Sequence, residues 1–551
     1  MGNRALVQSG LSLATPHDCR AFACQTGPRR SRVLPLLALA GLALVLGLWR
    51  HHHFFHDDAY VSLRYAERLM VGQGLTWNDG ERLEGFSSPS WVAQVALLCG
   101  LGISLPLAAR LLGVVYALAT LVLWYRSRAE PAGLLALVTV SGFTMWAWGG
   151  LETVAACFWI LLAMVVVQRV GSQPMSSRGG LLFGLSLALV VLSRPEGIAV
   201  GMSLLCAAWP ARRGRFFRIG AACLMVVFLA YEIFRLAYFG DWIANGARAK
   251  TLGLPLGTRV ESAAIYLAKT APQWLGAVFV AGWMLAWSPE RKRACWLLLP
   301  VVPLLLVVVL GGGDHMLGAR FMLAPVAVMC LAGSLAPPSP RRWVRYCTSA
   351  LATVCALAQF QIAWRHPAAP NPAAAIGEIV GRALEARLTP GTLVATATAG
   401  SVPYFAPSLA FIDTLGLNDR HIARQSPAII SAARDAAENW AGVPGHLRGD
   451  GDYVLSRRPE VIVLGGANGD IAPWFLGDYQ VITSKAFQGA YAPWRLLVAV
   501  PPSLRPWVAD EIDAETGRLP VTLYVRRDTS AWSAIARDAA MLSPLWASAR
   551  E

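Results

Sequence analysis

The sequence of 551 residues has few charged side chains, no disulfide framework and no phosphate-binding glycine loop. Only 15% of the residues are charged and 55% are hydrophobic, and a soluble globular protein of this size is rarely so apolar. None of the ten cysteines lies after Cys355, and no CxxC pair occurs. This pattern excludes a disulfide scaffold and argues against a structural zinc site. No glycine-rich loop follows a strand pattern, so no nucleotide-binding pocket is predicted.

Hydrophobic runs close to the length of a membrane-spanning helix occupy most of the chain up to residue 364. A helix needs roughly 20 predominantly apolar residues to cross the hydrocarbon core. The runs lie at 33–49, 107–125, 132–148, 154–167, 181–192, 198–209, 219–237, 275–287, 296–310, 321–335 and 346–362. They predict a polytopic α-helical membrane protein with about 11 transmembrane helices. The shorter run at 91–103 is expected to lie in the outer interface.

Arginines at the ends of these runs predict the orientation of the chain. If Arg29, Arg30 and Arg32 are cytoplasmic, each later inward crossing ends at a basic patch, as the positive-inside rule requires. These patches contain Arg126, Arg169, Arg212, Arg291 and Arg341. The formal charge of +15 is therefore attributed to membrane orientation and not to nucleic-acid binding. No small-residue cleavage site follows the run at 33–49, so we expect it to remain as the first span.

The composition divides the chain into three predicted parts. Residues 1–32 are expected to form a disordered cytoplasmic tail. Residues 33–364 are expected to form a multi-span domain with an outer loop at 50–106. The last part, 365–551, has ordinary charge density and no spanning run. An amphipathic helix pattern at 373–388 and two strand patterns further on predict a soluble α/β domain on the extracytoplasmic side.

Short polar motifs gather at the predicted outer ends of the spans. They read "HDDAY" (56–60), "WGGLET" (148–153), "SRPEG" (193–197), "FGDWIANGARAK" (239–250) and "GGGDHMLGARF" (311–321). Ionisable groups close to the membrane are costly to place there and usually mark function. Because the inner ends carry mainly arginines, the sequence predicts a functional site that faces outward.

The order of these motifs resembles that of the polyprenyl-phosphate-sugar glycosyltransferases of the GT-C fold. The resemblance runs through "DDAY", "RYA", "GQGLTWNDGERLEGFSSPSW", "GLET", "RPEG" and "GGDH…R", and continues in "FIDTLGLNDRHIA" and "GHLRGDGDYVLSRRPEVIVL". It is closest to the mycobacterial cell-wall terminal arabinofuranosyltransferases. The resemblance implies a bacterial inner-membrane enzyme that transfers a sugar, arabinofuranose above all, from a polyprenyl phosphate to an extracytoplasmic glycan or glycoprotein, with inversion.

The same resemblance suggests which residues form the site. By position, Asp57 and Asp58 match the family's catalytic base, and we expect Asp57 to serve, with Asp58 second. One of the two is expected to cap the helix at 59–70 while the other faces the cavity. The donor phosphate and substrate are expected to contact Arg64, Glu152, Arg194, Glu196, Arg248, Lys250, Asp314 and Arg320. The family tends to have a proline before the asparagine of "IANGARAK", which weakens a role for Asn245.

Structural interpretations of the same residues stay open. The two aspartates could serve only as helix caps, and "RPEG" could be a turn with an internal ion pair. Asp314 and Arg320 could pair across their loop. The run 51–56, "HHHFFH", is expected to be a solvated interfacial segment and not a metal site, so no metal ligand is assigned, although a divalent cation remains an open cofactor. The alternatives in function are a flippase or transporter of a lipid-linked sugar, or a related GT-C enzyme with a hexose or amino sugar donor.

Overall fold

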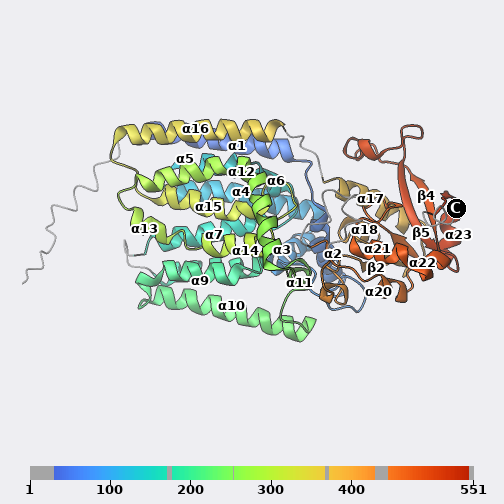
Figure 1. The fold of residues 1–551 in the computed structure, drawn as a ribbon. Coiled ribbons are helices and arrows are strands. Elements are labelled where there is room, and N and C mark those ends of the chain that lie inside the picture. The colour runs from blue at the N-terminus through green and yellow to red at the C-terminus, as the bar shows by residue number, and fades with distance from the viewer. Residues whose placement is uncertain (1–29, 171–175, 252, 366–370, 429–444, 545–551) are drawn as a thin grey trace, which may run out of the picture.

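The computed structural model joins a bundle of helices to a smaller domain built on a β-sheet (Figure 1). It describes residues 30–170, 176–251, 253–365, 371–428 and 445–544. Residues 1–29 of the predicted disordered tail therefore lie outside the described residues. The bundle and the sheet domain lie end to end, and the helices of the bundle run roughly along the line that joins them.

The predicted spanning runs fall mainly on helix, but in the run at 296–310 residues 297–300 form a turn between two helices. The bundle contains α1 (Arg30–His51), α2 (Asp57–Met70), α3 (Pro89–Gly100), α4 (Leu105–Ser127), α5 (Pro131–Val138), α6 (Ser141–Trp148), α7 (Thr153–Gln168), α8 (Ser177–Ser193), α9 (Gly197–Ala207), α10 (Arg215–Phe239), α11 (Asn245–Thr251), α12 (Leu256–Ala286), α13 (Arg291–Trp296), α14 (Val301–Gly311), α15 (Arg320–Leu335) and α16 (Arg342–Arg365). The run at 132–148 is divided between α5 and α6, which are bent by 63°. Helix α12 begins well before the predicted run at 275–287.

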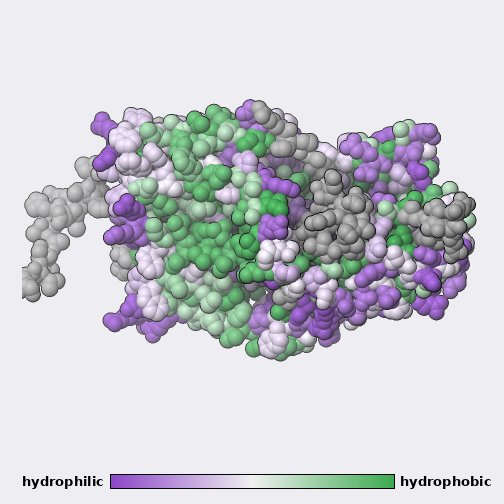
Figure 2. Space-filling view, viewed as in Figure 1, coloured by the Kyte–Doolittle hydropathy of each residue, from purple (hydrophilic) through white to green (hydrophobic). Residues whose placement is uncertain are grey.

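Four helices of the described residues are long and apolar enough to cross a membrane. They are Leu34–His51, Leu105–Ser127, Arg215–Phe239 and Arg342–Trp364, and the bent pair α5–α6 makes a fifth if it counts as one span. Six further apolar helices are shorter, at 10–17 residues. Figure 2 shows hydrophobic side chains over the middle of the bundle and hydrophilic ones at its far end and over the sheet domain. This distribution is that of a membrane protein, whereas the number of about 11 spans stays a prediction.

The far end of the bundle brings together segments that the sequence predicts to be cytoplasmic. Arg293 of α13 donates hydrogen bonds of 2.9 and 2.8 Å to the carbonyls of Gln168, the last residue of α7, and Val170. Helix α13 lies at the end of the bundle opposite the sheet domain (Figure 1). Two predicted basic patches therefore meet at one end, as a single inner face requires.

The C-terminal part is a six-stranded mixed sheet with the order β2-β1-β3-β5-β4-β6. Its elements are α17 (Pro372–Glu385), β1 (Leu393–Thr396), α18 (Ser401–Tyr404), β2 (Ala410–Asp413), α20 (Gly451–Ser456), β3 (Val461–Val463), α21 (Leu476–Thr483), α22 (Lys485–Ala490), β4 (Tyr491–Val498), β5 (Leu519–Arg526), α23 (Ser530–Ala536) and β6 (Ala539–Met541). Strands β2, β1 and β3 are parallel, and β5, β4 and β6 continue antiparallel. The predicted amphipathic helix and both predicted strands are present as α17, β1 and β3.

Helices α2 and α11 connect the bundle to the sheet domain (Figure 1). Helix α2 packs against α18, and α11 packs against the short turn Ile422–Arg424 that follows β2. The approach of α2 to α18 needs a glycine, because a Cβ atom at Gly400 would lie 2.0 Å from the carbonyl oxygen of Asp57. The polar motifs of the outer ends therefore lie at the junction of the two parts.

Candidate active site

The outer ends of several helices surround a cavity of about 340 Å³. Its walls come from the start of α2, the segment before α7, the turn between α8 and α9, helix α11 and the loop between α14 and α15. Its charged or titratable lining residues are Asp58, Glu152, Arg194, Glu196, Lys250, Asp314, His315 and Arg320. The fold thus brings together seven of the ten predicted site residues. Asp57, Arg64 and Arg248 are not among the lining residues.

Asp58 reaches the cavity because of how α2 begins. The N-cap residue is His56, whose backbone is extended and whose ring Nδ1 accepts a hydrogen bond of 3.1 Å from the Asp58 N–H. The prediction that one of the two aspartates caps this helix is therefore wrong. Both lie in its first turn, where a carboxylate interacts favourably with the helix dipole. The Asp58 side chain is 25% exposed, and its Oδ2 lies 3.1 Å from the Nζ of Lys250 on α11.

Electrostatics keep Asp58 ionised. Burial by itself would raise the pKa of this carboxyl. The positive charge of Lys250, with smaller contributions from His56 and His315, outweighs burial and holds the pKa of Asp58 below its usual value. An ionised carboxylate can accept a proton from a hydroxyl that enters the cavity.

Asp57 points to the sheet domain instead. Its Oδ1 accepts a hydrogen bond of 2.8 Å from the Ser401 N–H and a second one from the Ser401 hydroxyl. Burial raises the pKa of Asp57 to about 6, although the two hydrogen bonds from Ser401 oppose that shift. Between the two predicted bases, the geometry favours Asp58, because Asp57 is engaged in the contact between α2 and α18.

The remaining charges of the cavity form compact ion pairs. Arg194 lies between two carboxylates, at 3.0 Å from Glu152 and 2.8 Å from Glu196. At the start of α15, Arg320 Nε lies 2.8 Å from Asp314 Oδ2. The predicted ion pairs within "RPEG" and across the α14–α15 loop are both present. Both guanidinium groups also lie over the ring of Phe321, at 5.2 and 4.9 Å from its centre.

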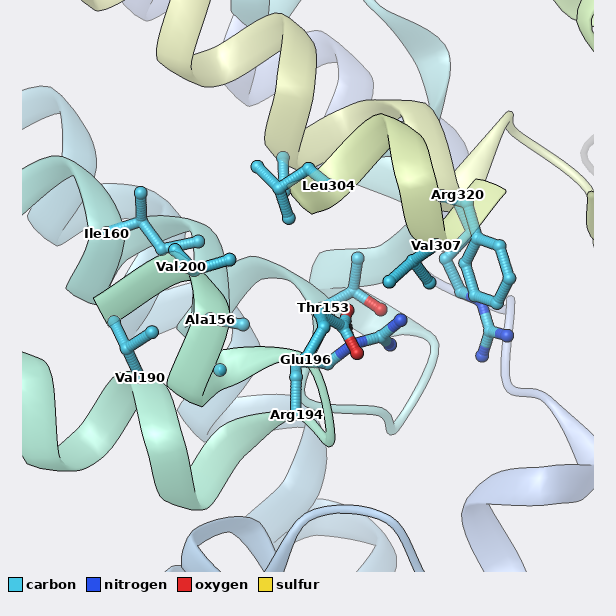
Figure 3. Close-up of a pocket in the computed structure, with 13 residues that line it drawn as sticks. Thr153, Ala156, Ile160, Val190, Arg194, Glu196, Val200, Leu304, Val307 and Arg320 are labelled. Carbon is cyan, nitrogen blue, oxygen red and sulfur yellow. Dashed lines mark hydrogen bonds and ion pairs between the residues drawn. The ribbon is translucent and has the colours of Figure 1, made fainter. Parts of the chain in front are cut away.

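An apolar cleft adjoins the cavity at these arginines (Figure 3). It has a volume of about 30 Å³ and shares Arg194, Glu196 and Arg320 with the cavity. Its other end is lined by aliphatic side chains of α7, α8, α9 and α14, among them Ile160, Val190, Val200 and Leu304. In Figure 3 the charged groups of Arg194 and Glu196 lie at one end and these aliphatic side chains at the other. The site therefore combines a polar chamber with a hydrophobic extension into the bundle.

Two predicted binding residues have structural positions instead. Arg64 is 2% exposed and donates hydrogen bonds to the carbonyls of Trp77 and Pro403, so it holds the first outer loop against the sheet domain. Arg248 pairs with Asp241 at 2.7 Å. The sequence alone did not distinguish these two arginines from those of the cavity. Which way a helical side chain points depends on how its helix packs.

Asn245 has a positioning role that its weak match to the family did not suggest. Its Nδ2 donates to the carbonyls of Gly416 and Leu417 at 2.8 and 2.9 Å. These carbonyls belong to the loop after β2, and Leu417 lines the cavity. Asn245 therefore fixes one wall of the cavity from the first residue of α11.

The histidines at 51–56 and the carboxylates of the cavity bear on the open question of a metal ion. The expectation of a solvated run at 51–56 is wrong except for His52 and His53, since His51, Phe54, Phe55 and His56 are all buried. No group of three or more histidine, cysteine, aspartate or glutamate side chains suited to a metal ion occurs among the described residues. Asp58 and Asp314 are each neutralised by a cationic side chain, so these residues do not fit a divalent cation. His315, which lines the cavity, was missed, although it lies inside a motif singled out from the sequence.

Comparison with known proteins finds relatives of one kind. A family model described as a domain of unknown function, DUF8728, matches residues 366–507. The chain is 30% identical over 248 residues to a terminal beta-(1->2)-arabinofuranosyltransferase of Mycobacterium tuberculosis, covering 40% of this chain and 38% of that protein. A protein of the same name from Corynebacterium glutamicum is 28% identical over 370 residues, which are 57% of this chain and 52% of that protein. The chain thus matches about half, or less, of the length of these curated relatives.

Two solved structures share the fold at low sequence identity. ArnT from Cupriavidus metallidurans in the apo state has a TM-score of 0.52 and 13% identity, and the match covers 89% of this chain and 97% of that chain. The archaeal oligosaccharyltransferase AglB from Archaeoglobus fulgidus, in complex with an inhibitory peptide and a dolichol-phosphate, has a TM-score of 0.52 and 12% identity, with coverage of 91% and 77%. The chain is therefore a membrane protein with the fold of the GT-C glycosyltransferases, and its sequence resembles the terminal arabinofuranosyltransferases.

Proposed function

We propose that the chain is a membrane glycosyltransferase that transfers arabinofuranose from a polyprenyl-phosphate donor to an extracytoplasmic glycan or glycoprotein. The observation that carries this proposal is the single cavity that joins the ionised Asp58, the cation of Lys250 and an apolar cleft. The names of the two relatives support arabinofuranose as the sugar. The dolichol-phosphate in the AglB complex supports a phosphate on an isoprenoid as the carrier.

The donor would use both parts of the site. Its phosphate would meet Lys250, which is 35% exposed and therefore the most accessible of the paired cations at the cavity. Arg194 and Arg320 lie where the chamber meets the cleft, but their charges are balanced by Glu152, Glu196 and Asp314. The isoprenoid would lie in the bilayer against the bundle beside the cleft, because a cleft of about 30 Å³ is too small to hold it. A lipid-borne donor also removes the need for the nucleotide pocket that the sequence lacks.

In this proposal Asp58 is the general base. It accepts the proton of the acceptor hydroxyl while the hydroxyl oxygen attacks the anomeric carbon from the side opposite the phosphate. The bond from that carbon to the phosphate oxygen breaks, the phosphate leaves with the electron pair, and the configuration inverts. Transfer of Lys250 from Asp58 to the phosphate would raise the proton affinity of Asp58 when the donor is bound.

We also propose the membrane arrangement that this chemistry requires. The chain lies in a bacterial inner membrane with about 11 spans, its N-terminus in the cytoplasm and residues 365–551 outside. The meeting of predicted basic patches at the end of the bundle away from the sheet domain supports this orientation. The acceptor and the polyprenyl phosphate headgroup would then meet at the outer leaflet.

Replacement of Asp58 by Asn tests the proposal. Vesicles containing the full chain, a radiolabelled polyprenyl-phosphate arabinofuranose and an oligosaccharide acceptor should show transfer reduced by about 10²-fold or more, since Asn cannot take the proton. Asp57→Asn is the matched control and should keep most of the activity, because its Oδ1 can still accept from Ser401.

Full transfer by Asp58→Asn would refute this residue as the base. If the labelled donor crosses the membrane of the vesicle without release of polyprenyl phosphate in any variant, the chain is a transporter and not a transferase.

A further inference from the structure

A second and larger cavity lies on the outer side of the site, between the end of α10, the first outer loop and the loop after β2. Its volume is about 750 Å³. We call it the outer groove. Its lining includes Arg82, Tyr238, Arg420, His421, Arg424 and Tyr453. None of these residues lines the 340 Å³ cavity, so the outer groove is a separate feature of the junction between the bundle and the sheet domain.

The wall between the two cavities is thin. Leu417 lines the inner cavity, and the next residue, Asn418, lines the outer groove. In the first outer loop, Gly85 lines the inner cavity and Leu83 the groove. Consecutive Cα atoms are about 3.8 Å apart, so a ligand of several sugar residues is long enough to span both cavities.

Hydrogen bonds hold this wall in place. The Tyr65 hydroxyl donates to the carbonyl of Leu83 at 2.8 Å and also contacts Asn418 Oδ1 at 3.2 Å. It accepts a hydrogen bond of 3.0 Å from the Gly85 N–H. Asn245 ties the other side of the wall to α11. The spacing of the two cavities is therefore fixed by buried contacts.

The lining of the outer groove offers hydrogen-bond donors that carry no ion pair. The Arg82 guanidinium lies over the ring of Tyr238 at 4.8 Å, and within the part of the chain that the structure describes no carboxylate lies in salt-bridge range of it. Arg420 is bound to backbone carbonyls, among them that of Arg82 at 3.1 Å. Glu81 and Asp419 add acceptors to the same groove.

Flat surfaces accompany these polar groups. The ring of His421 stacks on that of Tyr453, with 4.1 Å between their centres, and the His421 side chain is 45% exposed. The outward plane of Arg82 provides a second flat surface. Hydroxyl-rich ligands with one apolar face pack on such planes while donors and acceptors at the rim bind their hydroxyls. Three arginines and two carboxylates leave the lining with little net charge, which suits a neutral ligand.

We propose that the outer groove binds the inner residues of a neutral oligosaccharide acceptor whose terminal residue reaches Asp58. This inference rests on the proposed glycosyl transfer and assigns to it a remote acceptor subsite. The groove then selects acceptors by length: a short glycan reaches only the inner cavity, and a longer one gains the contacts with Arg82 and His421.

The test compares linear arabinofuranose oligosaccharides of two and six residues as acceptors for the full chain in vesicles. Arg82→Ala and His421→Ala should each raise KM for the hexasaccharide by about tenfold, the effect of losing one contact of a charged donor or a stacked ring. The kcat and the KM for the disaccharide should not change. Arg458→Ala, an exposed arginine elsewhere in the sheet domain, is the control.

A measurement of oligosaccharide binding without sugar transfer tests the outer groove independently of the proposed function. A fluorescent hexasaccharide should bind the purified full chain, and Arg82→Ala should weaken that binding by about tenfold even if no arabinofuranose is transferred. The inference is overturned if the variant affects disaccharide and hexasaccharide equally, if binding is unchanged, or if only a polyanionic glycan displaces the probe. Loss of all transfer with retained hexasaccharide binding would instead refute the proposed function.

Discussion

At the scale of single residues, two adjacent aspartates have opposite environments. Successive residues of a helix point about 100° apart, so Asp58 faces Lys250 and the cavity while Asp57 faces Ser401. One cation lowers the pKa of Asp58, whereas burial raises the pKa of Asp57 to about 6. The sequence around the two aspartates was therefore insufficient to show which one is the base. The cation that lowers the pKa of Asp58 belongs to a lysine 192 residues away.

The ion pair of Asp58 predicts a pH effect. In Lys250→Met the main positive charge beside the carboxylate is lost, and burial then raises the pKa of Asp58. A protonated carboxyl cannot act as a base, so the transfer rate falls at low pH. This fall, the acidic limb of the pH–rate profile, should move to higher pH in the variant. The measurement is the rate of sugar transfer from pH 4 to pH 8, with the position of the limb read separately from its height.

Arg248→Met is the matched control for this change. Arg248 lies on the same helix and pairs with Asp241 instead of Asp58. It should leave the acidic limb where it is in the unaltered chain. An unchanged limb in Lys250→Met would show that Asp58 does not control the rate in this range.

At the scale of elements, α2 and α18 form one of the contacts that connect the bundle to the sheet domain. The Ser401 N–H and hydroxyl both point to Asp57 Oδ1, and Gly400 allows the backbones to approach. Because α18 is only four residues long, its stability depends on packing against its neighbours, α17 and α2. The junction carries one wall of the cavity, so its order affects the site.

Truncation of Asp57 tests this contact. Asp57→Ala leaves the Ser401 N–H without its acceptor and should lower the free energy of unfolding by about 1–3 kcal/mol. Asp57→Asn keeps an acceptor at the same place and should stay close to the unaltered chain. Thermal unfolding of the purified chain in detergent measures both, and equal stability of the Ala variant would contradict the role assigned to Ser401.

The helices themselves were largely predictable. Most of each apolar run became helix, because a backbone without water partners must satisfy its hydrogen bonds internally, although residues 297–300 form a turn inside one of the runs. The bend between α5 and α6 and the early start of α12 were not predicted, since neither changes the hydrophobic pattern at its boundary. In the sheet domain the predicted strands became β1 and β3, but the pairing of β3 with β5 joins residues more than 60 positions apart, a distance at which no local pattern acts.

At the scale of the whole molecule, the two ends of the bundle differ in chemistry. The sheet domain and the polar cavity lie at one end, and helix α13 with its arginines lies at the other (Figure 1). The proposed function requires that these ends face opposite sides of the membrane. This arrangement is open to labelling of exposed positions on either side.

Single cysteines at three exposed positions test the orientation. In a chain whose native cysteines are replaced, a membrane-impermeant maleimide should label Gln73→Cys and Glu515→Cys in intact cells. Lys292→Cys should react only after lysis, because α13 is assigned to the cytoplasmic face. Labelling of all three in intact cells, or of Lys292→Cys alone, would contradict the proposed orientation and the outward site.

The sequence by itself determined the membrane-helix character, the resemblance to a family and the set of motifs in which the site is found. These properties depend on local composition and on residue order, which the chain carries before it folds. Only the tertiary structure decided that Asp58 and not Asp57 faces the cavity, that Arg64 and Arg248 bind elsewhere, and that an outer groove adjoins the site. Such choices follow from the packing of distant segments, whose contacts set the direction of each side chain and the charge that surrounds it.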